Sequence, residues 1–148
     1  MTQPTPVQQN FGTAAADYAT SSYHAAGPDL KLLVEKAALR GTERVLDVGT
    51  GAGHTALAVA PHAARVTGID LTQEMLEQAR GLAASRKLAN VSFLEGDALA
   101  LPFDAASFDV VTSRQSAHHY AGISAAIDET KRVLSPGGRF LLIDTFAP

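Results

Sequence analysis

Val45-Leu-Asp-Val-Gly-Thr-Gly-Ala-Gly53 is a short apolar run that carries one acid, Asp47, and passes into three closely spaced glycines. Apolar residues in such a short run favour a buried strand. The glycines then allow the backbone to turn tightly and to approach a bound molecule with no Cβ in the way. The segment therefore predicts a strand that delivers a tight turn to a binding site, followed by the start of a helix.

Short apolar segments and helical patterns alternate on either side of this turn. Strands are expected at residues 44–48, 65–69, 91–95, 108–113 and 139–143. Helices are expected at residues 28–41, at 54–63, after a cap at Thr72, and at 122–134, with a stop at 135–138. This alternation is typical of βαβ units with right-handed crossovers, so the predicted fold is an open, doubly wound α/β sheet of parallel strands.

Length, net charge and cysteine content limit the classes of protein to which the chain can belong. The 148 residues suit one domain over residues 11–148, preceded by a flexible leader at 1–10. The net charge is -3 and the 12 Lys and Arg are scattered, so neither a nucleic-acid partner nor an acidic membrane surface is expected. With no cysteine, no apolar run of about 18 residues and no basic-apolar leader, we expect a cytoplasmic protein without disulfides or thiolate metal sites.

The glycine spacing separates two kinds of nucleotide site. Ligands of doubly wound sheets bind outside the carboxyl ends of the strands, which is where the glycine turn lies. A dinucleotide fingerprint, G-x-G-x-x-G, requires a third glycine at position 54, but His54 stands there. The pattern is D-x-G-x-G-x-G instead, which disfavours a nicotinamide oxidoreductase.

This pattern resembles motif I of the class I S-adenosylmethionine-dependent methyltransferases, and the similarity continues in order over residues 11–143. The further matching segments are Val66-Thr-Gly-Ile-Asp70, Glu95-Gly-Asp-Ala98, Phe103-Asp-Ala-Ala-Ser-Phe-Asp109, Arg114-Gln-Ser-Ala-His-His-Tyr120 and Phe11-Gly-Thr-Ala-Ala-Ala-Asp-Tyr18. The last of these is similar to the lid of the branch that contains the ubiquinone and menaquinone C-methyltransferases. The resemblance implies the strand order 3-2-1-4-5, an N-terminal helical lid, S-adenosyl-L-methionine as cofactor and a small-molecule methyl acceptor.

The resemblance also implies a set of cofactor-binding residues. Asp70 would accept hydrogen bonds from both ribose hydroxyls, although an acid favoured by the dipole at a helix start explains that residue equally well when it is taken alone. Asp97 would meet the adenine, although Gly96-Asp97 also suits a polar turn. The full set expected from the resemblance is Asp47, Gly49, Thr50, Gly51, Gly53, Asp70, Leu71, Asp97, Ala98, Arg114 and Tyr18.

His118 and His119 are the candidates for a catalytic base, because imidazole can take a proton near neutral pH. Two adjacent residues do not both point at one site in regular structure, so at most one is expected to act. A structural histidine at a helix start is the alternative. No third ligand has metal-site spacing nearby, and no metal is expected.

The resemblance further implies that the usual last two strands of the fold are missing after residue 143. The alternative to an active methyltransferase is therefore a truncated or degenerate cofactor-binding module, or a partner subunit, without turnover of its own. The apolar strand at 139–143 would then form a sheet edge with unpaired backbone groups. We expect such an edge to pair with a second copy of the chain as a homodimer.

Overall fold

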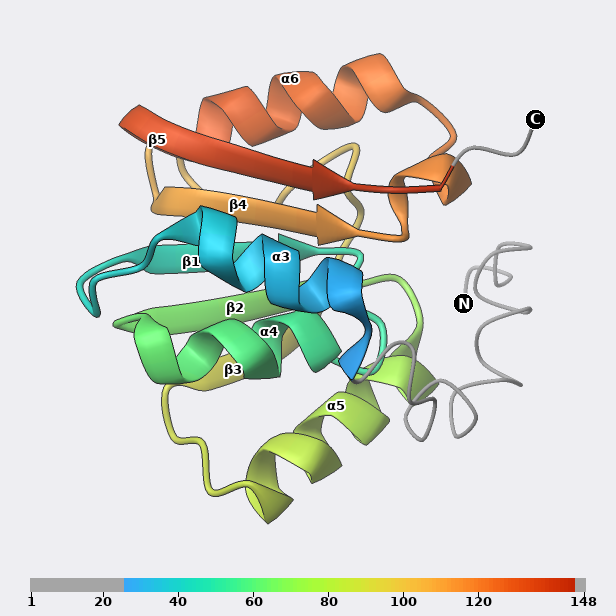
Figure 1. Ribbon diagram of the computed structural model, residues 1–148. Helices are drawn as coiled ribbons and strands as arrows, with labels where there is room; N and C mark the ends of the chain where they lie inside the picture. Colours follow the sequence, from blue (N-terminus) through green and yellow to red (C-terminus); the bar gives the residue numbers. More distant parts are fainter. Residues whose placement is uncertain (1–25, 146–148) are drawn as a thin grey trace.

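Apolar strand segments and helical segments alternate through residues 26–145, which are the residues that the computed structural model describes. The strands are β1 (Arg44–Val48), β2 (Arg65–Asp70), β3 (Val91–Glu95), β4 (Phe108–Arg114) and β5 (Leu134–Ile143). They form a five-stranded sheet in the order β3-β2-β1-β4-β5 with every neighbouring pair parallel (Figure 1). This order confirms the predicted doubly wound α/β fold.

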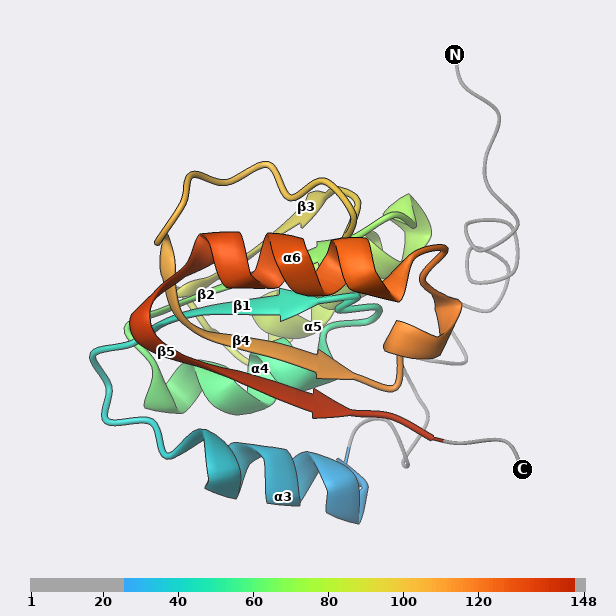
Figure 2. The same cartoon turned by 90° about the horizontal axis from the view of Figure 1, so that it is seen from above.

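Helices cover both faces of the sheet (Figures 1 and 2). The helices are α3 (Pro28–Ala37), α4 (His54–Val59), α5 (Gln73–Ser85) and α6 (Ile123–Val133), with single 3₁₀ turns at η1 (Ala60–His62) and η2 (Ala117–His119). Successive residues of a strand point to opposite faces. Val45 and Val110 therefore join the core formed with α3, α4 and α5, whereas Leu46 and Val111 join the core formed with α6. Because every neighbouring pair of strands is parallel, the carboxyl ends of all five strands meet at one edge of the sheet.

Two of the predicted helices are shorter than expected. The helix predicted at 28–41 ends at Ala37, because Ala38 adopts a left-handed conformation with φ of 47° and closes the helix. The helix predicted at 54–63 is divided into α4 and η1. Pro61 has no N–H to continue the α-helical ladder, which accounts for the tighter last turn.

The helix predicted at 122–134 stops before residues 135–138 as expected, but the strand predicted to begin at residue 139 begins earlier, because β5 starts at Leu134 and runs through these residues. Leu134 pairs with Phe108, and the register then shifts before Val110 pairs with Arg139. Gly137 takes a positive φ of 79° within this irregular part. A strand at the sheet edge tolerates such an irregularity, because no strand within residues 26–145 pairs with its outer side.

Thr72 stands at the N-cap of α5, as predicted, but its side chain makes no capping hydrogen bond. Its backbone N–H donates to Asp70 Oδ1 at 2.9 Å instead. The predicted leader at 1–10, the N-terminal lid and Tyr18 lie outside the described residues.

Candidate functional site

A cavity of about 430 Å³ opens at the carboxyl ends of the strands. Its walls come from the turn after β1, the ends of β2 and β3, the start of α5 and the segment after β4. The lining residues are Gly49, Thr50, Gly51, Ala52, His54, Thr55, Ile69, Asp70, Leu71, Met75, Gly96, Asp97, Ala98, Leu99, Arg114, Gln115, Ser116, His119, Tyr120 and Ala121. The volume suits a ligand of cofactor size, and most of the predicted site residues therefore share one cavity.

The glycine turn forms one wall of this cavity. Gly51 has a φ of 56°, and a Cβ there would stand 3.0 Å from the Met75 methyl group. Gly49 has a φ of 67°, and its Cβ would lie 2.7 Å from the Ser116 Cβ. These positions need glycine for both conformation and space. Gly53 does not line the cavity; a Cβ there would press on Ala79 and Phe93 at 2.9 Å, so its role is close packing of α4 on its neighbours.

Asp47 lies beneath the turn rather than on the cavity wall, and it is only 2% exposed. Its two carboxylate oxygens accept hydrogen bonds from the hydroxyls of Thr50 and Thr112, each at 2.7 Å. Burial raises the pKa of Asp47 to about 6, against the opposing effect of these two hydroxyls. Asp47 therefore links the glycine turn to β4 through these two hydrogen bonds. Because it does not line the cavity, its predicted contact with a cofactor stays a prediction.

Asp70 ends β2 and does line the cavity. Its Oδ2 accepts a hydrogen bond from the Gly51 N–H and its Oδ1 from the Thr72 N–H, both at 2.9 Å. Burial raises the pKa of this carboxyl above its ordinary value, while the backbone donors act in the opposite direction. Each carboxylate oxygen has a second lone pair, so Asp70 can still accept two hydrogen bonds from a ligand.

The far side of the cavity combines one acid with apolar side chains. Asp97 lines it, and its Oδ1 accepts the Leu99 N–H at 2.9 Å, which fixes the turn after β3. The apolar residues around it are Ile69, Leu71, Met75, Ala98 and Leu99. This half of the cavity suits a flat, mostly apolar group that carries a polar edge.

Arg114 is the last residue of β4, and its guanidinium forms an ion pair with a carboxylate on α3. Its Nε and Nη2 donate to the two oxygens of Asp29 on α3, at 2.7 and 3.0 Å. The hydrogen bond from Arg114, partly offset by burial, lowers the pKa of Asp29. Arg114 also lines the cavity. The contact that the structure shows for its guanidinium is the ion pair with Asp29, which attaches the first turn of α3 to the end of β4.

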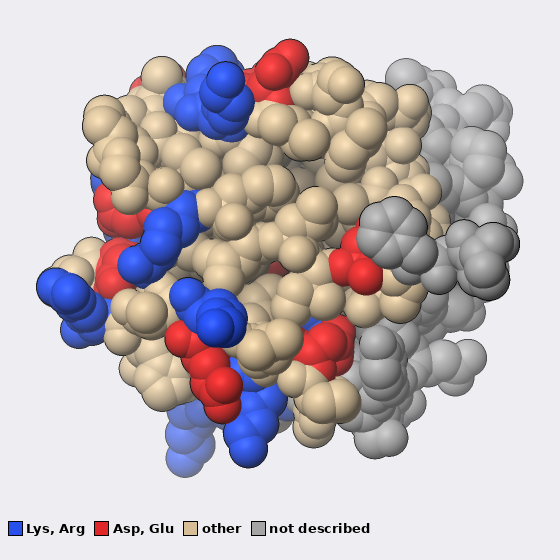
Figure 3. Space-filling view, turned by 45° about the horizontal axis from the view of Figure 1, so that its top comes forward, with Lys and Arg blue, Asp and Glu red and all other residues tan. Residues whose placement is uncertain are grey.

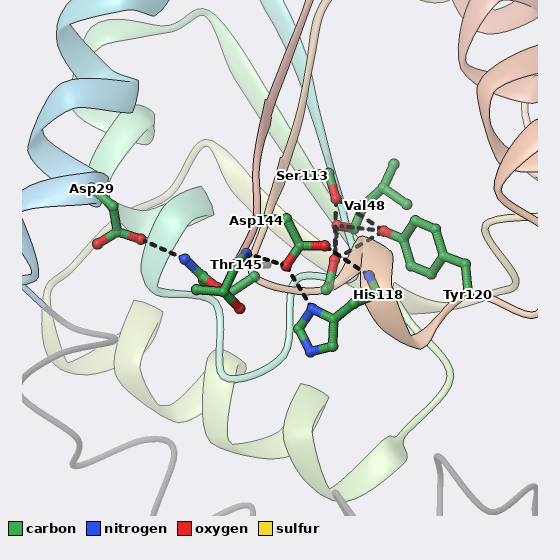
Figure 4. A network of polar contacts seen from close by, with 9 residues as sticks. Asp29, Val48, Ser113, His118, Tyr120, Asp144 and Thr145 are labelled. Carbon is green, nitrogen blue, oxygen red and sulfur yellow. Dashed lines mark hydrogen bonds and ion pairs between the residues drawn. The ribbon is translucent and has the colours of Figure 1, made fainter. Parts of the chain in front are cut away.

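Three hydroxyls gather where the segment after β4 meets the glycine turn (Figure 4). The Tyr120 hydroxyl lies 3.0 Å from Ser113 Oγ and 2.9 Å from Ser116 Oγ. Tyr120 and Ser116 also donate to the Val48 carbonyl, each at 3.3 Å. Burial raises the pKa of Tyr120 to about 12, so the phenol stays neutral. Ser116 and Tyr120 line the cavity but were not among the predicted site residues, because no spacing rule links them to the turn.

The two candidate bases lie side by side on η2 but in different surroundings. His119 lines the cavity, and burial together with the neighbouring His118 lowers its pKa. His118 is not among the lining residues; its side chain is 41% exposed, and its Nδ1 lies 2.5 Å from Asp144 Oδ1 (Figure 4). The two imidazole rings are 3.9 Å apart between centroids. Asp144, which follows β5, was not among the predicted site residues.

Two kinds of site are absent from residues 26–145. No group of three or more His, Cys, Asp or Glu there could hold a metal ion. No helix in this described part is long and apolar enough to cross a membrane.

Comparison with known proteins agrees with this geometry. Residues 46–142 match the family described as a methyltransferase domain. The uncharacterized methyltransferase YcgJ of Bacillus subtilis (strain 168) is 44% identical over 148 residues, which are 100% of this chain and 57% of that protein. The demethylmenaquinone methyltransferase of Thermus thermophilus is 42% identical over 113 residues, which are 75% of this chain and 51% of that protein.

The fold comparison gives the same result. The crystal structure of the YcgJ protein from Bacillus subtilis has a TM-score of 0.78 at 46% identity, over 80% of this chain and 51% of that one. The chain thus spans about half the length of the curated relatives that it matches. The glycine turn, the parallel sheet and these similarities together confirm the resemblance seen in the sequence. The chain belongs to the class I S-adenosylmethionine-dependent methyltransferases, the family whose cofactor is S-adenosylmethionine.

Proposed function

We propose that the chain binds S-adenosylmethionine in the cavity at the carboxyl ends of the strands and transfers its methyl group to a small-molecule acceptor. The observation that carries this proposal is the convergence of the glycine turn and the Asp70 carboxylate on one cavity of about 430 Å³. The family to which the chain belongs supports the identity of the cofactor, and the cavity supports the location of its binding site.

The residues present fit the parts of this cofactor. Any side chain at Gly51 would reduce the space beside Met75, so the bare backbone leaves room for a ligand at the turn. Asp70 offers the two free lone pairs that the neighbouring hydroxyls of a ribose require. The apolar half around Leu71 and Leu99, with Asp97 at its edge, suits an adenine ring with its amino group.

The protein has a limited chemical task in this reaction. When bound, S-adenosylmethionine supplies a methyl group that is already activated on a sulfonium. The residues of the chain bind the two ends of the cofactor, orient the acceptor and exclude water. Of the predicted set, Gly49, Thr50, Gly51, Asp70, Leu71, Asp97, Ala98 and Arg114 line the cavity and are the residues proposed to hold the cofactor.

A cofactor-binding module or partner subunit without turnover is the second candidate. It requires only the cofactor cavity, which the residues after β1, β2, β3 and β4 already form. Incubation with S-adenosylmethionine and a panel of small phenols, thiols and amines tests the two. Release of S-adenosylhomocysteine above the acceptor-free rate supports the transferase, whereas binding of the cofactor with no release favours the module.

We also propose that a second copy of the chain pairs with the outer edge of β5. The strand stands at the end of the sheet order, and its Phe140 and Leu142 are 37% and 45% exposed. Ile123 and Ile127 of α6 add two exposed apolar side chains on the same side. The view that brings α6 and β5 forward has a broad area without charged side chains (Figure 3).

A cytoplasmic location is part of the proposal, supported by the absence of cysteine.

A further inference from the structure

The Lys and Arg residues are scattered in the sequence but sorted in space. In βαβ units each helix runs back against the strands, so helix ends and strand starts share the amino edge of the sheet, away from the cavity (Figure 1). Arg139 belongs to this edge because it pairs with Val110 near the start of β4. Residues 1–25 and 146–148 contain no Lys or Arg. Apart from Lys31 on the exposed side of α3 and Arg114 at the end of β4, the Lys and Arg lie at a strand start, in the second half of a helix or in an adjoining loop: Lys36, Arg40, Arg44, Arg65, Arg80, Arg86, Lys87, Lys131, Arg132 and Arg139.

Carboxylates lie at the opposite edge, around the cavity. β2 and β3 end in Asp70 and Glu95, and Asp97 follows β3. Asp70 and Asp97 line the cavity. Among residues 26–145, Arg114 is the one Lys or Arg that lines it, and its Nε and Nη2 donate to both oxygens of Asp29. Because the charges of this ion pair balance, the charge that remains on the cavity wall is negative.

The glycine turn uses its backbone donors inside the protein. The Thr50 N–H donates to the Ile69 carbonyl at 2.9 Å. The Gly51 N–H donates to Asp70 Oδ2 at 2.9 Å, and the Gly53 N–H donates to the Thr50 carbonyl at 2.8 Å. A turn that binds phosphate instead points such N–H groups at its ligand. These three donors therefore do not form a nest for an anionic group.

The hydroxyl cluster of Ser113, Ser116 and Tyr120 offers lone pairs rather than hydrogens (Figure 4). The three oxygens lie 3.1, 3.0 and 2.9 Å from one another, and those of Ser116 and Tyr120 also lie 3.3 Å from the Val48 carbonyl oxygen. Three hydroxyl hydrogens do not suffice for all of these contacts, so the hydrogens are used within the cluster. Ser116 and Tyr120 line the cavity, where their oxygens can accept hydrogen bonds from a ligand.

Resting on the proposed function, we propose that the methyl acceptor is an uncharged or cationic small molecule that donates hydrogen bonds, and that molecules with a carboxylate or phosphate group are excluded. An anionic group would lie near Asp70 and Asp97 with no further Lys or Arg on the described cavity wall to balance it. Arg114 does not serve this purpose, because it is paired with Asp29 and belongs to the set proposed to hold the cofactor, which brings a carboxylate of its own.

A single introduced cysteine measures the charge at the cavity without any turnover, because the chain has no cysteine of its own. Ala121→Cys places a thiol at an exposed residue of the cavity wall, and Ala84→Cys places one on α5 near Arg80 and Lys87 as the matched control. At low ionic strength, each thiol reacts with a methanethiosulfonate that carries a trimethylammonium group and with one that carries a sulfonate. Relative to mercaptoethanol, the cation-to-anion ratio of rates should be higher by about fivefold at position 121 and lower at position 84. A ratio at position 121 no higher than that of mercaptoethanol would overturn the proposal.

Acceptor charge is tested directly with tyramine, tyrosol and phloretate, phenols whose two-carbon arms end in an ammonium, a hydroxyl and a carboxylate. Methylation of tyramine and of tyrosol should exceed that of phloretate by about tenfold. Glu74→Lys in the first turn of α5 should narrow this difference, whereas Glu35→Lys near the end of α3 changes the net charge equally and should not. Methylation of phloretate as fast as that of tyrosol would contradict the inference. Failure of the unmodified chain to bind S-adenosylhomocysteine would instead contradict the proposed function, and the thiol rates would still decide the inference.

Discussion

Asp47 and Asp70 lie near the carboxyl ends of neighbouring strands, yet their surroundings give them different roles. Both oxygens of Asp47 are taken by threonine hydroxyls beneath the glycine turn. Asp70 stands on the cavity wall, where each of its oxygens accepts one backbone N–H, from Gly51 and from Thr72. The enclosed carboxylate of Asp47 therefore stabilises the glycine turn, whereas the carboxylate of Asp70 faces the cavity and can bind a ligand.

Asp70→Ala should weaken the binding of S-adenosylmethionine by about 1.5–3 kcal/mol, the range for hydrogen bonds to a charged group. Isothermal titration of the variant and of the unmodified chain measures this loss. Asp128→Ala removes an exposed carboxylate on α6 and should leave the affinity unchanged. An Asp70→Ala variant with unaltered affinity would remove Asp70 from the site.

The raised pKa of Asp47 predicts a pH-dependent contribution to stability. Its value of about 6 in the folded chain lies above the ordinary 3.8, so the folded state binds the additional proton. The contribution is therefore complete below pH 3.8 and is lost as the pH rises through 6. The unfolding free energy of the chain minus that of Asp47→Asn should be larger at pH 5 than at pH 7.5 by about 1 kcal/mol. Urea unfolding at both pH values measures it, and an equal or reversed difference would contradict the assignment.

How far the site could be predicted from the sequence depends on the kind of residue. The glycine turn and Asp70 were found because their spacing follows from one strand and one crossover. Arg114 was assigned to the cofactor, but its partner Asp29 lies 85 residues away, and only the tertiary fold brings the two together. Asp144 was missed for the same reason, because it reaches His118 across 26 residues of sequence.

At the scale of elements, α5 contains a glycine that the structure does not require. Gly81 lies in the exposed part of the helix, and a Cβ there would meet nothing within 4 Å. Gly81→Ala should raise the unfolding free energy by about 0.5–1 kcal/mol and the melting temperature by about 2–4 °C, because alanine loses less backbone entropy. Thermal unfolding followed by circular dichroism measures the shift.

Gly49→Ala is the counterpart of that change. Its left-handed backbone and the nearby Ser116 side chain leave no place for a methyl group, so this variant should be less stable than the unmodified chain. Equal effects of the two alanines, or a loss of stability in Gly81→Ala, would show that local backbone conformation does not govern stability at these two positions.

Among the strands, prediction succeeded where local composition decides the bounds and failed where pairing with a neighbour decides them. The strands β1 and β3 were predicted with their observed bounds, because both are short apolar segments with clear turns at their ends. Residues 135–138 carry the composition of a turn, yet they continue β5, because pairing with β4 supplies backbone hydrogen bonds that local propensity does not anticipate.

For the whole molecule, the edge strand β5 predicts self-association. Light scattering at micromolar concentration should give twice the 15.4 kDa of one chain. Leu142→Lys places a charge beside the β5 edge and should shift the mass toward the monomer. Leu32→Lys introduces the same charge at an exposed leucine of α3, on the other side of the sheet, and should leave the dimer intact. A monomeric mass for the unmodified chain at these concentrations would refute this prediction.

The family, the sheet order and the cavity all point to one ligand class for the whole molecule. The rival nucleotide for a doubly wound sheet is a nicotinamide dinucleotide, which the position of His54 disfavours. Isothermal titration of one preparation with S-adenosylmethionine, S-adenosylhomocysteine and NAD compares the two directly. Both sulfur compounds should bind at a single site and NAD should bind at least tenfold more weakly. Tighter binding of NAD, or no heat of binding with either sulfur compound, would contradict the account.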